Sequence, residues 1–126
     1  KNKICFFGPV DRNLLPDIYA SAHVCVFPSH IETLGLVAPE AMAMNRAVVF
    51  SETGPGQEVI THQVDGLLCN PHDSQDIANK VCDLLADQEN LGRMARAARQ
   101  KALSKFAPSV LLQENVRFYE SLRKLN

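Results

Sequence analysis

The sequence predicts an α/β fold in which a parallel sheet is flanked by helices and followed by a helical C-terminal tail. Short continuous apolar runs, typical of strands buried on both faces, alternate with longer segments whose apolar residues recur at helical spacing. Strands that alternate with helices in this way form parallel sheets joined by crossover connections. A chain of 126 residues has a natural size for one domain, so residues 1–126 are expected to form a single domain.

The N-terminal part of the chain contains two predicted strands and one predicted helix. Ile4–Phe7 is an uninterrupted apolar run that ends at Gly8, so a buried strand and a turn are expected there. Leu14–Ala22 has apolar residues at helical spacing, and this helix is expected to begin near Asn13. Val24–Phe27 is the next apolar run and the second predicted strand.

The middle of the chain is expected to form a helix and a third strand. Helical spacing of apolar residues begins at Leu36, and Pro39 is compatible with it because first-turn amides have no intrahelical partner. Asn45 tolerates the left-handed conformation that ends many helices, and Ala47–Ser51 then forms a buried strand. One broad face of the helix is expected to be apolar, with Leu36, Val37, Ala41, Met42 and Met44.

The last part of the chain is expected to form three longer helices. Before them, a short helix is expected at Gln57–Thr61, followed by a turn at Asp65 and the next glycine. Asp73 or Ser74 can cap the first long helix. Two more helices are predicted: one runs from Leu91 to about Leu103 with Asn90 as its cap, and the last runs from Val110 to Leu125.

Charge and composition argue against several classes of partner. The net charge of −1 gives no electrostatic reason to expect nucleic acid or an anionic membrane. No apolar run approaches the roughly 18 residues that span a bilayer. A basic strip on the Leu91 helix lacks interleaved aromatic residues that would stack bases, so it is expected to be a solvated face. Its members are Arg93, Arg96, Arg99 and Lys101.

The cysteines and histidines indicate reduced thiols and no metal site. The 4 cysteines include no Cys-x-x-Cys pair, and Cys5 and Cys25 lie in predicted buried strands. His23, His62 and His72 have no ligand-like spacing to one another or to the cysteines. Reduced core thiols point to a reducing compartment, and the cytoplasm is the expected location.

Two glutamates on either side of a glycine are the strongest functional feature. Glu32 follows the second predicted strand, and Glu40 lies in the first turns of the helix that begins after Gly35. Such a helix start, beyond the carboxyl end of a strand, presents free amides and a partial positive charge to an anion. Two carboxylates would repel a bare phosphate but can accept hydrogen bonds from hydroxyls beside it, so a nucleotide sugar fits. The alternative is that Glu40 merely complements the helix dipole and Glu32 is a solvated loop residue.

The segment PSHIETLGLVAPEAMAMNRAVV resembles the donor-binding signature of retaining glycosyltransferases of family 4, which have the GT-B fold. That signature has two glutamates separated by seven residues, with Phe-Gly-Leu between them and Glu-Ala-Met-Ala at its end. This sequence supplies Glu32, Leu34-Gly35-Leu36 and Glu40–Ala43. The departures are mild: Leu34 replaces the usual Phe, Asn45 the usual Gly and Ala47 the usual Pro. The resemblance extends over nearly the whole chain and implies a Rossmann-like sheet with a short fourth strand after Gly66.

The resemblance implies a role for each matching residue. In the family the first glutamate contacts hydroxyls of the donor sugar, which makes Glu32 the candidate catalytic residue. The second glutamate contacts the ribose hydroxyls, which gives that role to Glu40. The backbone that follows the glycine meets the diphosphate, so Gly35, Leu36 and Val37 are candidate donor-binding residues.

Three further residues are candidate donor contacts. His30 precedes Glu32 by two positions and could donate to a phosphate or a sugar, although loop histidines are more often plain surface residues. Gly54 and Gly56 resemble a family loop that passes close to the donor sugar, and Glu58 after them is a weaker candidate. The alternative for this loop is a simple turn into the short helix.

The resemblance implies sugar transfer from a nucleotide sugar with a UDP, GDP or ADP moiety, retention of anomeric configuration and no required metal or other cofactor. It also implies that this chain is the C-terminal part of a donor domain, without the acceptor domain and the first strand–helix units. Such a fragment is expected to be inactive alone and prone to self-association through uncovered apolar surface. The acceptor (a glycan, a lipid or a small molecule) would be bound by the missing domain, and membrane association of the full-length protein stays open.

Two alternatives to a transferase remain open at this stage. One is a nucleotide-sugar epimerase of GT-B architecture, against which the Glu-Ala-Met-Ala signature argues. The other is a non-catalytic nucleotide-sugar-binding or structural α/β module. The base, the sugar and the acceptor are not specified by the sequence.

Overall fold

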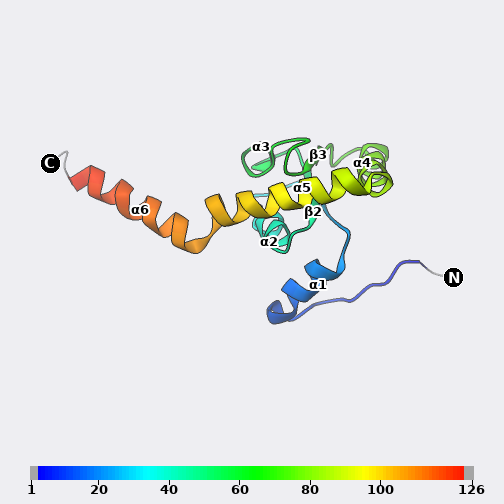
Figure 1. Ribbon diagram of the computed structural model, residues 1–126, viewed down its shortest axis with the longest axis horizontal. Helices are drawn as coiled ribbons and strands as arrows, with labels where there is room; N and C mark the ends of the chain where they lie inside the picture. The colour runs from blue at the N-terminus through cyan, green and yellow to red at the C-terminus, as the bar shows by residue number, and fades with distance from the viewer. Residues whose placement is uncertain (1–2, 124–126) are drawn as a thin grey trace.

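A computed structural model describes residues 3–123 and has a three-stranded parallel sheet at its centre (Figure 1). The strands are β1 (Val24–Phe27), β2 (Ala47–Ser51) and β3 (Leu67–Cys69), in the order β1-β2-β3. Val24 pairs with Ala47, and Val49 pairs with Leu67. The predicted parallel sheet is therefore confirmed, including the bounds predicted for β1 and β2.

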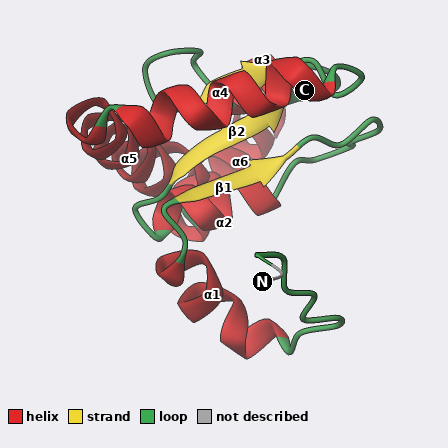
Figure 2. Cartoon of the chain, turned by 90° about the vertical axis from the view of Figure 1, so that its right-hand side faces the viewer, coloured by secondary structure: helices red, strands yellow, loops and turns green. Residues whose placement is uncertain are grey.

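Helices cover both faces of this sheet (Figure 2). Helix α2 (Val37–Ala43) packs on one face against Val48 and Phe50 of the central strand, and α4 (Ser74–Ala86) packs on the other face against Val49. Helix α5 (Gln88–Lys101) contributes buried residues to both apolar clusters. All five residues of β2 are buried, as a strand between two helical layers requires.

The expected strand at Ile4–Phe7 is wrong. Within residues 3–123 this segment pairs with no strand, and Phe6 is 92% exposed. The chain instead runs along the short helix α1 (Leu15–Ser21), away from the sheet (Figure 1). An apolar run becomes a strand only where a neighbouring strand supplies hydrogen bonds and a face to pack on, and this segment meets neither condition. The expected burial of Cys5 is wrong for the same reason.

The remaining elements follow the prediction closely, with shifts at their ends. A 3₁₀ turn at Arg12–Leu14 precedes α1. Asn45 follows α2 with a φ of 59°, as expected for a left-handed cap. The short helix α3 is Gly56–Val59, and Asp73 caps α4 through the amides of Gln75 and Asp76. The helix α2 has Ala38, Ala41 and Met42 as its buried residues, whereas Leu36 is exposed.

The expected cap at Asn90 is wrong, because α5 begins earlier. Asp87 is the N-cap, and its carboxylate accepts a hydrogen bond of 2.9 Å from the amide of Asn90. Both side chains are competent caps, so local chemistry did not distinguish them. After α5 a π-helical turn at Ala102–Phe106 leads into α6 (Pro108–Arg123), and the predicted end at Leu125 lies outside the described residues.

Three members of the basic strip on α5 bind other parts of the chain, so the prediction that the strip is only a solvated face is wrong for these residues. Arg93 donates to the carbonyl of Gln63, and Arg99 donates to the carbonyl of Ala43 at the end of α2. Lys101 lies 3.1 Å from the carboxylate of Asp65, which is only 5% exposed, and also donates to Thr61. These contacts tie α5 to the loop before β3 and to the end of α2.

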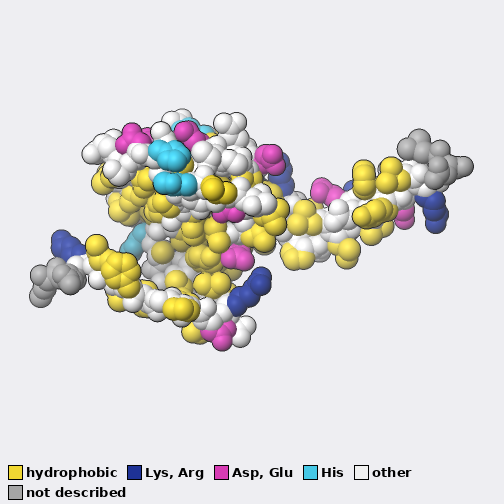
Figure 3. All heavy atoms as spheres, turned by 180° about the vertical axis from the view of Figure 1, so that it is seen from behind, with side chains coloured by type: hydrophobic (Ala, Val, Ile, Leu, Met, Phe, Trp, Pro, Cys, Tyr) yellow, Lys and Arg dark blue, Asp and Glu magenta, His cyan; other side chains and the backbone are white. Residues whose placement is uncertain are grey.

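Helix α6 projects away from the sheet and has no buried residue in the described chain (Figures 1 and 3). Its apolar side chains form an exposed stripe of Leu111, Leu112, Val116, Phe118, Tyr119 and Leu122. No helix among residues 3–123 is both long and apolar enough to cross a membrane.

Replacing Phe50 should test whether β2 is the centre of the core. Phe50 is fully buried and packs edge-on against Phe27 with ring centroids 6.5 Å apart. We expect Phe50→Ala to lower the free energy of unfolding by about 3–5 kcal/mol, because it leaves a cavity between the sheet and α2. The exposed Phe118 is the matched control, and Phe118→Ala should change stability by less than about 0.5 kcal/mol in the same urea titration. Equal effects of the two substitutions would contradict this view of the core.

Candidate functional site

The loop that follows β1 is held by the carboxylate of Glu32. Its Oε1 accepts hydrogen bonds of 3.0 Å from the amides of both Thr33 and Gly35. Gly35 has a φ of +64°, and a Cβ there would lie 2.9 Å from Cζ of the buried Phe50 ring. The loop therefore folds tightly over the end of β2, and within the described residues the second oxygen of Glu32 accepts no hydrogen bond.

The glycine loop after β2 lies directly against the Glu32 loop. Gly54 has a φ of +59°, and a Cβ at this position would be 2.6 Å from the carbonyl oxygen of Glu32. Thr53 adds a side-chain bridge, because its hydroxyl donates to the carbonyl of Ser29 at 3.4 Å. A Cβ on Gly56 would collide with the carbonyl of Ser51. The structure thus brings Glu32 and both loop glycines to the carboxyl ends of β1 and β2.

The start of α2 presents two backbone amides. Among residues 3–123 the amides of Leu36 and Val37 donate to no protein acceptor, whereas the amide of Ala38 bonds to the carbonyl of Gly35. The side chain of Leu36 is 61% exposed, so the turn is open to solvent. Free amides at this place are what the sequence predicted for an anion contact.

Glu40 lies on α2, half-buried beside Tyr19 of α1. The phenol of Tyr19 donates to Oε2 of Glu40 at 3.3 Å. Burial and then the adjacent negative charge of Glu40 raise the pKa of Tyr19 above its usual value, so the phenol keeps its proton at neutral pH. A cavity of about 230 Å³ adjoins the pair, lined by Arg12, Leu15, Pro16, Tyr19, Glu40, Ala43 and Met44.

Sequence reasoning missed the part played by Tyr19. Tyr19 lies within Leu14–Ala22, where its ring fits the apolar face of the predicted helix. The feature that points to a polar role for Tyr19 is its hydroxyl, because a partly buried tyrosine normally needs a hydrogen-bond partner for this group. Nothing in the chain before folding identifies that partner as a glutamate 21 positions later.

His30 is exposed and lies apart from the Glu32 carboxylate contacts. Its ring packs against the ring of His72, with centroids 4.5 Å apart and an interplanar angle of 48°. The two histidines come from the loops after β1 and β3, so the contact joins two strand ends. Glu58, the weaker candidate, is exposed on α3.

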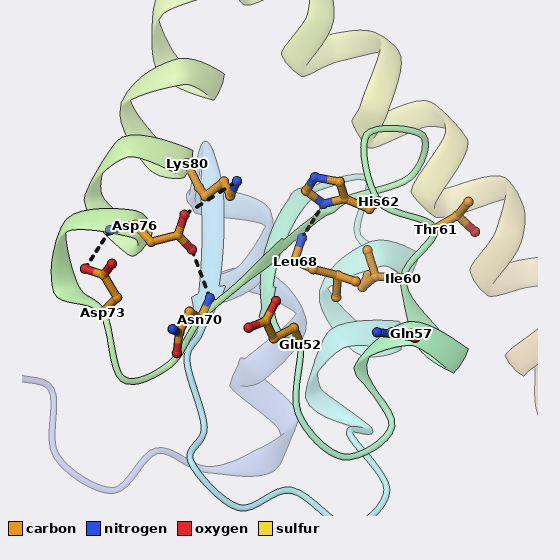
Figure 4. A pocket seen from close by; sticks show the side chains of 10 residues that line it. All are labelled: Glu52, Gln57, Ile60, Thr61, His62, Leu68, Asn70, Asp73, Asp76 and Lys80. Carbon is orange, nitrogen blue, oxygen red and sulfur yellow. Dashed lines mark hydrogen bonds and ion pairs between the residues drawn. The ribbon is translucent and has the colours of Figure 1, made fainter.

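A larger cavity of about 700 Å³ lies beside β3 and α4 and contains none of the predicted site residues (Figure 4). Of its acidic side chains, Asp73 caps α4, and Asp76 accepts from the amide of Asn70 and pairs with Lys80, whereas Glu52 forms no side-chain hydrogen bond or ion pair within residues 3–123. His62 accepts a hydrogen bond from the amide of Leu68 through Nδ1. Among residues 3–123, no group of three or more His, Cys, Asp or Glu side chains is arranged to hold a metal ion.

The thiols of Cys25 and Cys69 are free and buried, as predicted for Cys25. Burial raises the pKa of both thiols, which keeps them protonated and poorly reactive at neutral pH. They belong to the core of the sheet rather than to the site.

The sheet, its two helical layers and the loops at its carboxyl edge define a Rossmann-like α/β protein, a class in which ligands bind outside the carboxyl ends of the strands. The family model described as "Glycosyl transferases group 1" matches residues 1–101. This chain therefore belongs to the group 1 glycosyltransferase family.

Named relatives agree with this assignment. An uncharacterised glycosyltransferase of Methanocaldococcus jannaschii is 33% identical over 120 residues, which are 95% of this chain and 31% of that protein. A D-inositol 3-phosphate glycosyltransferase of Xylanimonas cellulosilytica is 37% identical over 99 residues, 79% of this chain and 24% of that protein. The chain thus spans less than a third of the length of these relatives.

Solved structures show the same fold. Sucrose-phosphate synthase from Thermosynechococcus elongatus superposes with a TM-score of 0.87 at 31% identity, covering 97% of this chain and 31% of that one. HepE of Anabaena, solved in complex with UDP, superposes with a TM-score of 0.83 at 27% identity, covering 87% of this chain and 30% of that one. The fold is accordingly that of the GT-B glycosyltransferase structures.

A pair of glycine substitutions should test the contact between the two loops. Gly54 and Gly8 both have a positive φ, but a Cβ on Gly8 meets nothing within 4 Å. Gly8→Ala should therefore measure only the left-handed strain, roughly 1–2 kcal/mol. Gly54→Ala should lower the free energy of unfolding by roughly a further 1–3 kcal/mol, because the methyl group must displace the Glu32 carbonyl. Equal losses in chemical denaturation would mean that the loops are not in contact.

Proposed function

We propose that the full-length protein transfers a sugar from a nucleotide sugar to an acceptor with retention of configuration, and that this chain supplies part of its donor site. The observation that carries the proposal is the Glu32–Gly35–Glu40 signature at the β1 end and the α2 start, in a chain of the group 1 family. We further assign the chain to family 4 and to the C-terminal part of the donor domain. HepE of Anabaena has also been solved with UDP-glucose, which supports a nucleotide-sugar donor.

Glu40 is the proposed ribose-binding residue. Its carboxylate is half-buried at the wall of the 230 Å³ cavity, and one carboxylate can accept both hydrogens of a vicinal diol. The contact contributes donor binding rather than chemistry, because the ribose is remote from the bond that breaks.

Glu32 is the proposed catalytic residue, and it orients the donor sugar. The two loop amides occupy Oε1, so Oε2 is the oxygen available to a sugar hydroxyl. The transition state of glycosyl transfer resembles an oxocarbenium ion, and a nearby carboxylate stabilises its positive charge. Gly54 and Gly56 allow the close contacts with the carbonyls of Glu32 and Ser51 that hold their loop beside the Glu32 loop. We retain both glycines as donor contacts, together with His30 at the start of the loop after β1.

The leaving nucleoside diphosphate is proposed to bind the amides of Leu36 and Val37. Negative charge develops on the diphosphate as the glycosidic bond breaks, and amides fixed in advance stabilise that charge without reorganisation. Gly35 makes this possible because its positive φ turns the chain into the first turn of α2. The acceptor and the remaining diphosphate contacts are assigned to parts of the protein outside this chain.

Two glutamate substitutions test the assignment in the full-length protein. UDP, GDP and ADP and their sugars are titrated first, to identify the donor that binds. We expect Glu40→Ala to raise the Kd for that donor about tenfold or more, since hydrogen bonds from ribose hydroxyls to a carboxylate are lost. Glu32→Ala should in addition lower kcat by on the order of 10²-fold, because it removes a contact made in the transition state.

The outcome of these titrations separates the candidate functions. Glu114→Ala is the matched control, since Glu114 is exposed on α6 and its loss should leave both constants unchanged. Unaltered kinetics in both site variants would overturn the proposed site. Donor binding without product formation would favour the non-catalytic module, and a rearranged nucleotide sugar as product would favour the epimerase.

We also propose that transfer needs no metal ion, as the family resemblance implies. The helix-start amides at Leu36 and Val37 would take part of the role that a cation has in other glycosyl transfer sites. Turnover of the full-length protein should therefore be the same after dialysis against EDTA as before it. A loss of activity that added Mg²⁺ or Mn²⁺ restores would contradict the proposal.

A further inference from the structure

The position of the Glu40 carboxylate depends on one side chain from another helix. Among residues 3–123 the only hydrogen bond to this carboxylate is the 3.3 Å contact from the Tyr19 hydroxyl. A glutamate has three rotatable side-chain bonds, and a free carboxylate on a helix samples several rotamers. The contact from Tyr19 therefore decides which orientation the carboxylate has before any ligand arrives.

The Tyr19 hydroxyl acts as a donor at a fixed place. Its ring packs edge-on against Phe27 of β1, with centroids 6.3 Å apart and planes at 80°. Phe27 packs in turn against the buried Phe50 of β2. The end of α1 is anchored as well, because Arg46 donates to the carbonyl of Ala22 at 3.0 Å. The Tyr19 phenol is protonated at neutral pH, as for an ordinary tyrosine, so it has a proton to donate to Glu40.

The same geometry leaves Glu40 able to bind a diol. A phenol has one proton, so Tyr19 occupies one acceptor position on Oε2. Within the described residues Oε1 accepts no hydrogen bond, and Oε2 keeps a second lone pair. The carboxylate can therefore receive one hydroxyl on each oxygen while Tyr19 holds it.

We propose that Tyr19 is a positioning residue for the donor nucleotide, and that its hydroxyl fixes the Glu40 carboxylate in the orientation that receives the two ribose hydroxyls. This inference rests on the proposed function, which assigns ribose binding to Glu40. In this role Tyr19 acts through Glu40 and takes no part in breaking the glycosidic bond. Its contribution is to remove the disorder of the carboxylate before binding, which is a form of preorganisation.

The test compares ribonucleotides with nucleotides that lack the two hydroxyls. Calorimetry measures the binding of UDP, GDP and ADP, and of the 2′,3′-dideoxy counterpart of each, to the full-length protein. The ribonucleotide that binds the unmodified protein is used further, together with its dideoxy counterpart. Tyr19→Phe keeps the ring and its packing but removes the donor. We expect it to weaken ribonucleotide binding about three- to tenfold, which is the size of the net contribution of one ordinary hydrogen bond, and to leave dideoxynucleotide binding unchanged.

Matched variants separate this effect from damage to the fold. Tyr119→Phe removes the same hydroxyl from the second tyrosine, which is 70% exposed on α6, and should change neither affinity. The melting temperature of Tyr19→Phe should stay close to that of the unmodified protein. In steady-state assays the variant should raise KM for the donor and leave kcat nearly unchanged.

Each other outcome has a distinct meaning. A Tyr19→Phe variant that weakens both nucleotides equally, or neither, overturns the positioning role. Glu40→Ala should abolish the preference for the ribonucleotide. If that preference persists in Glu40→Ala, the ribose assignment of Glu40 fails and the inference on Tyr19 fails with it. If none of the nucleotides binds the unmodified protein, the proposed function itself is overturned.

Discussion

The complete burial of β2 is the constraint on which the rest of the structure depends. Five successive buried residues require cover on both faces, since alternate side chains of a strand point to opposite sides. Helices α2 and α4 supply that cover, and α5 closes the two apolar clusters at one end. Because β1 and β3 pair with β2 in parallel, all three strands end at the same edge, where the loops that carry the candidate site meet.

Close contacts between and within the two loops determine the shape of this site. The Glu32 carbonyl lies so close to Gly54 that no side chain fits between them. The Glu32 carboxylate satisfies two amides of its own loop with a single oxygen. In the described chain, the other oxygen of Glu32 and the amides of Leu36 and Val37 have no hydrogen-bond partner in the protein. Unpaired groups of this kind support the proposal that the site binds a ligand with both hydroxyls and a phosphate.

The aromatic contacts link the two glutamates. Tyr19, Phe27 and Phe50 pack edge-to-face in succession from α1 to β2, and the Phe50 ring lies under Gly35. The orientation of Glu40 and the turn that carries Glu32 therefore rest on the same core residue. Substitutions of these three aromatic residues are expected to alter both the geometry of the site and the stability of the fold. Substitutions on α6 are expected to alter neither.

The sequence by itself determined the elements whose signals are local. The apolar runs of β1 and β2, the left-handed Asn45 and the cap at Asp73 depend on near neighbours and on backbone sterics, so they were predictable. The glutamate pair was also visible, because its spacing is a property of the chain. Only the tertiary structure decided that Ile4–Phe7 pairs with no strand in the described chain. It also decided the partners of Arg99 and Lys101 and the hydrogen bond from Tyr19 to Glu40. These depend on residues 21 to 56 positions apart in the chain or on whether a neighbouring strand exists, and no local pattern encodes such pairings.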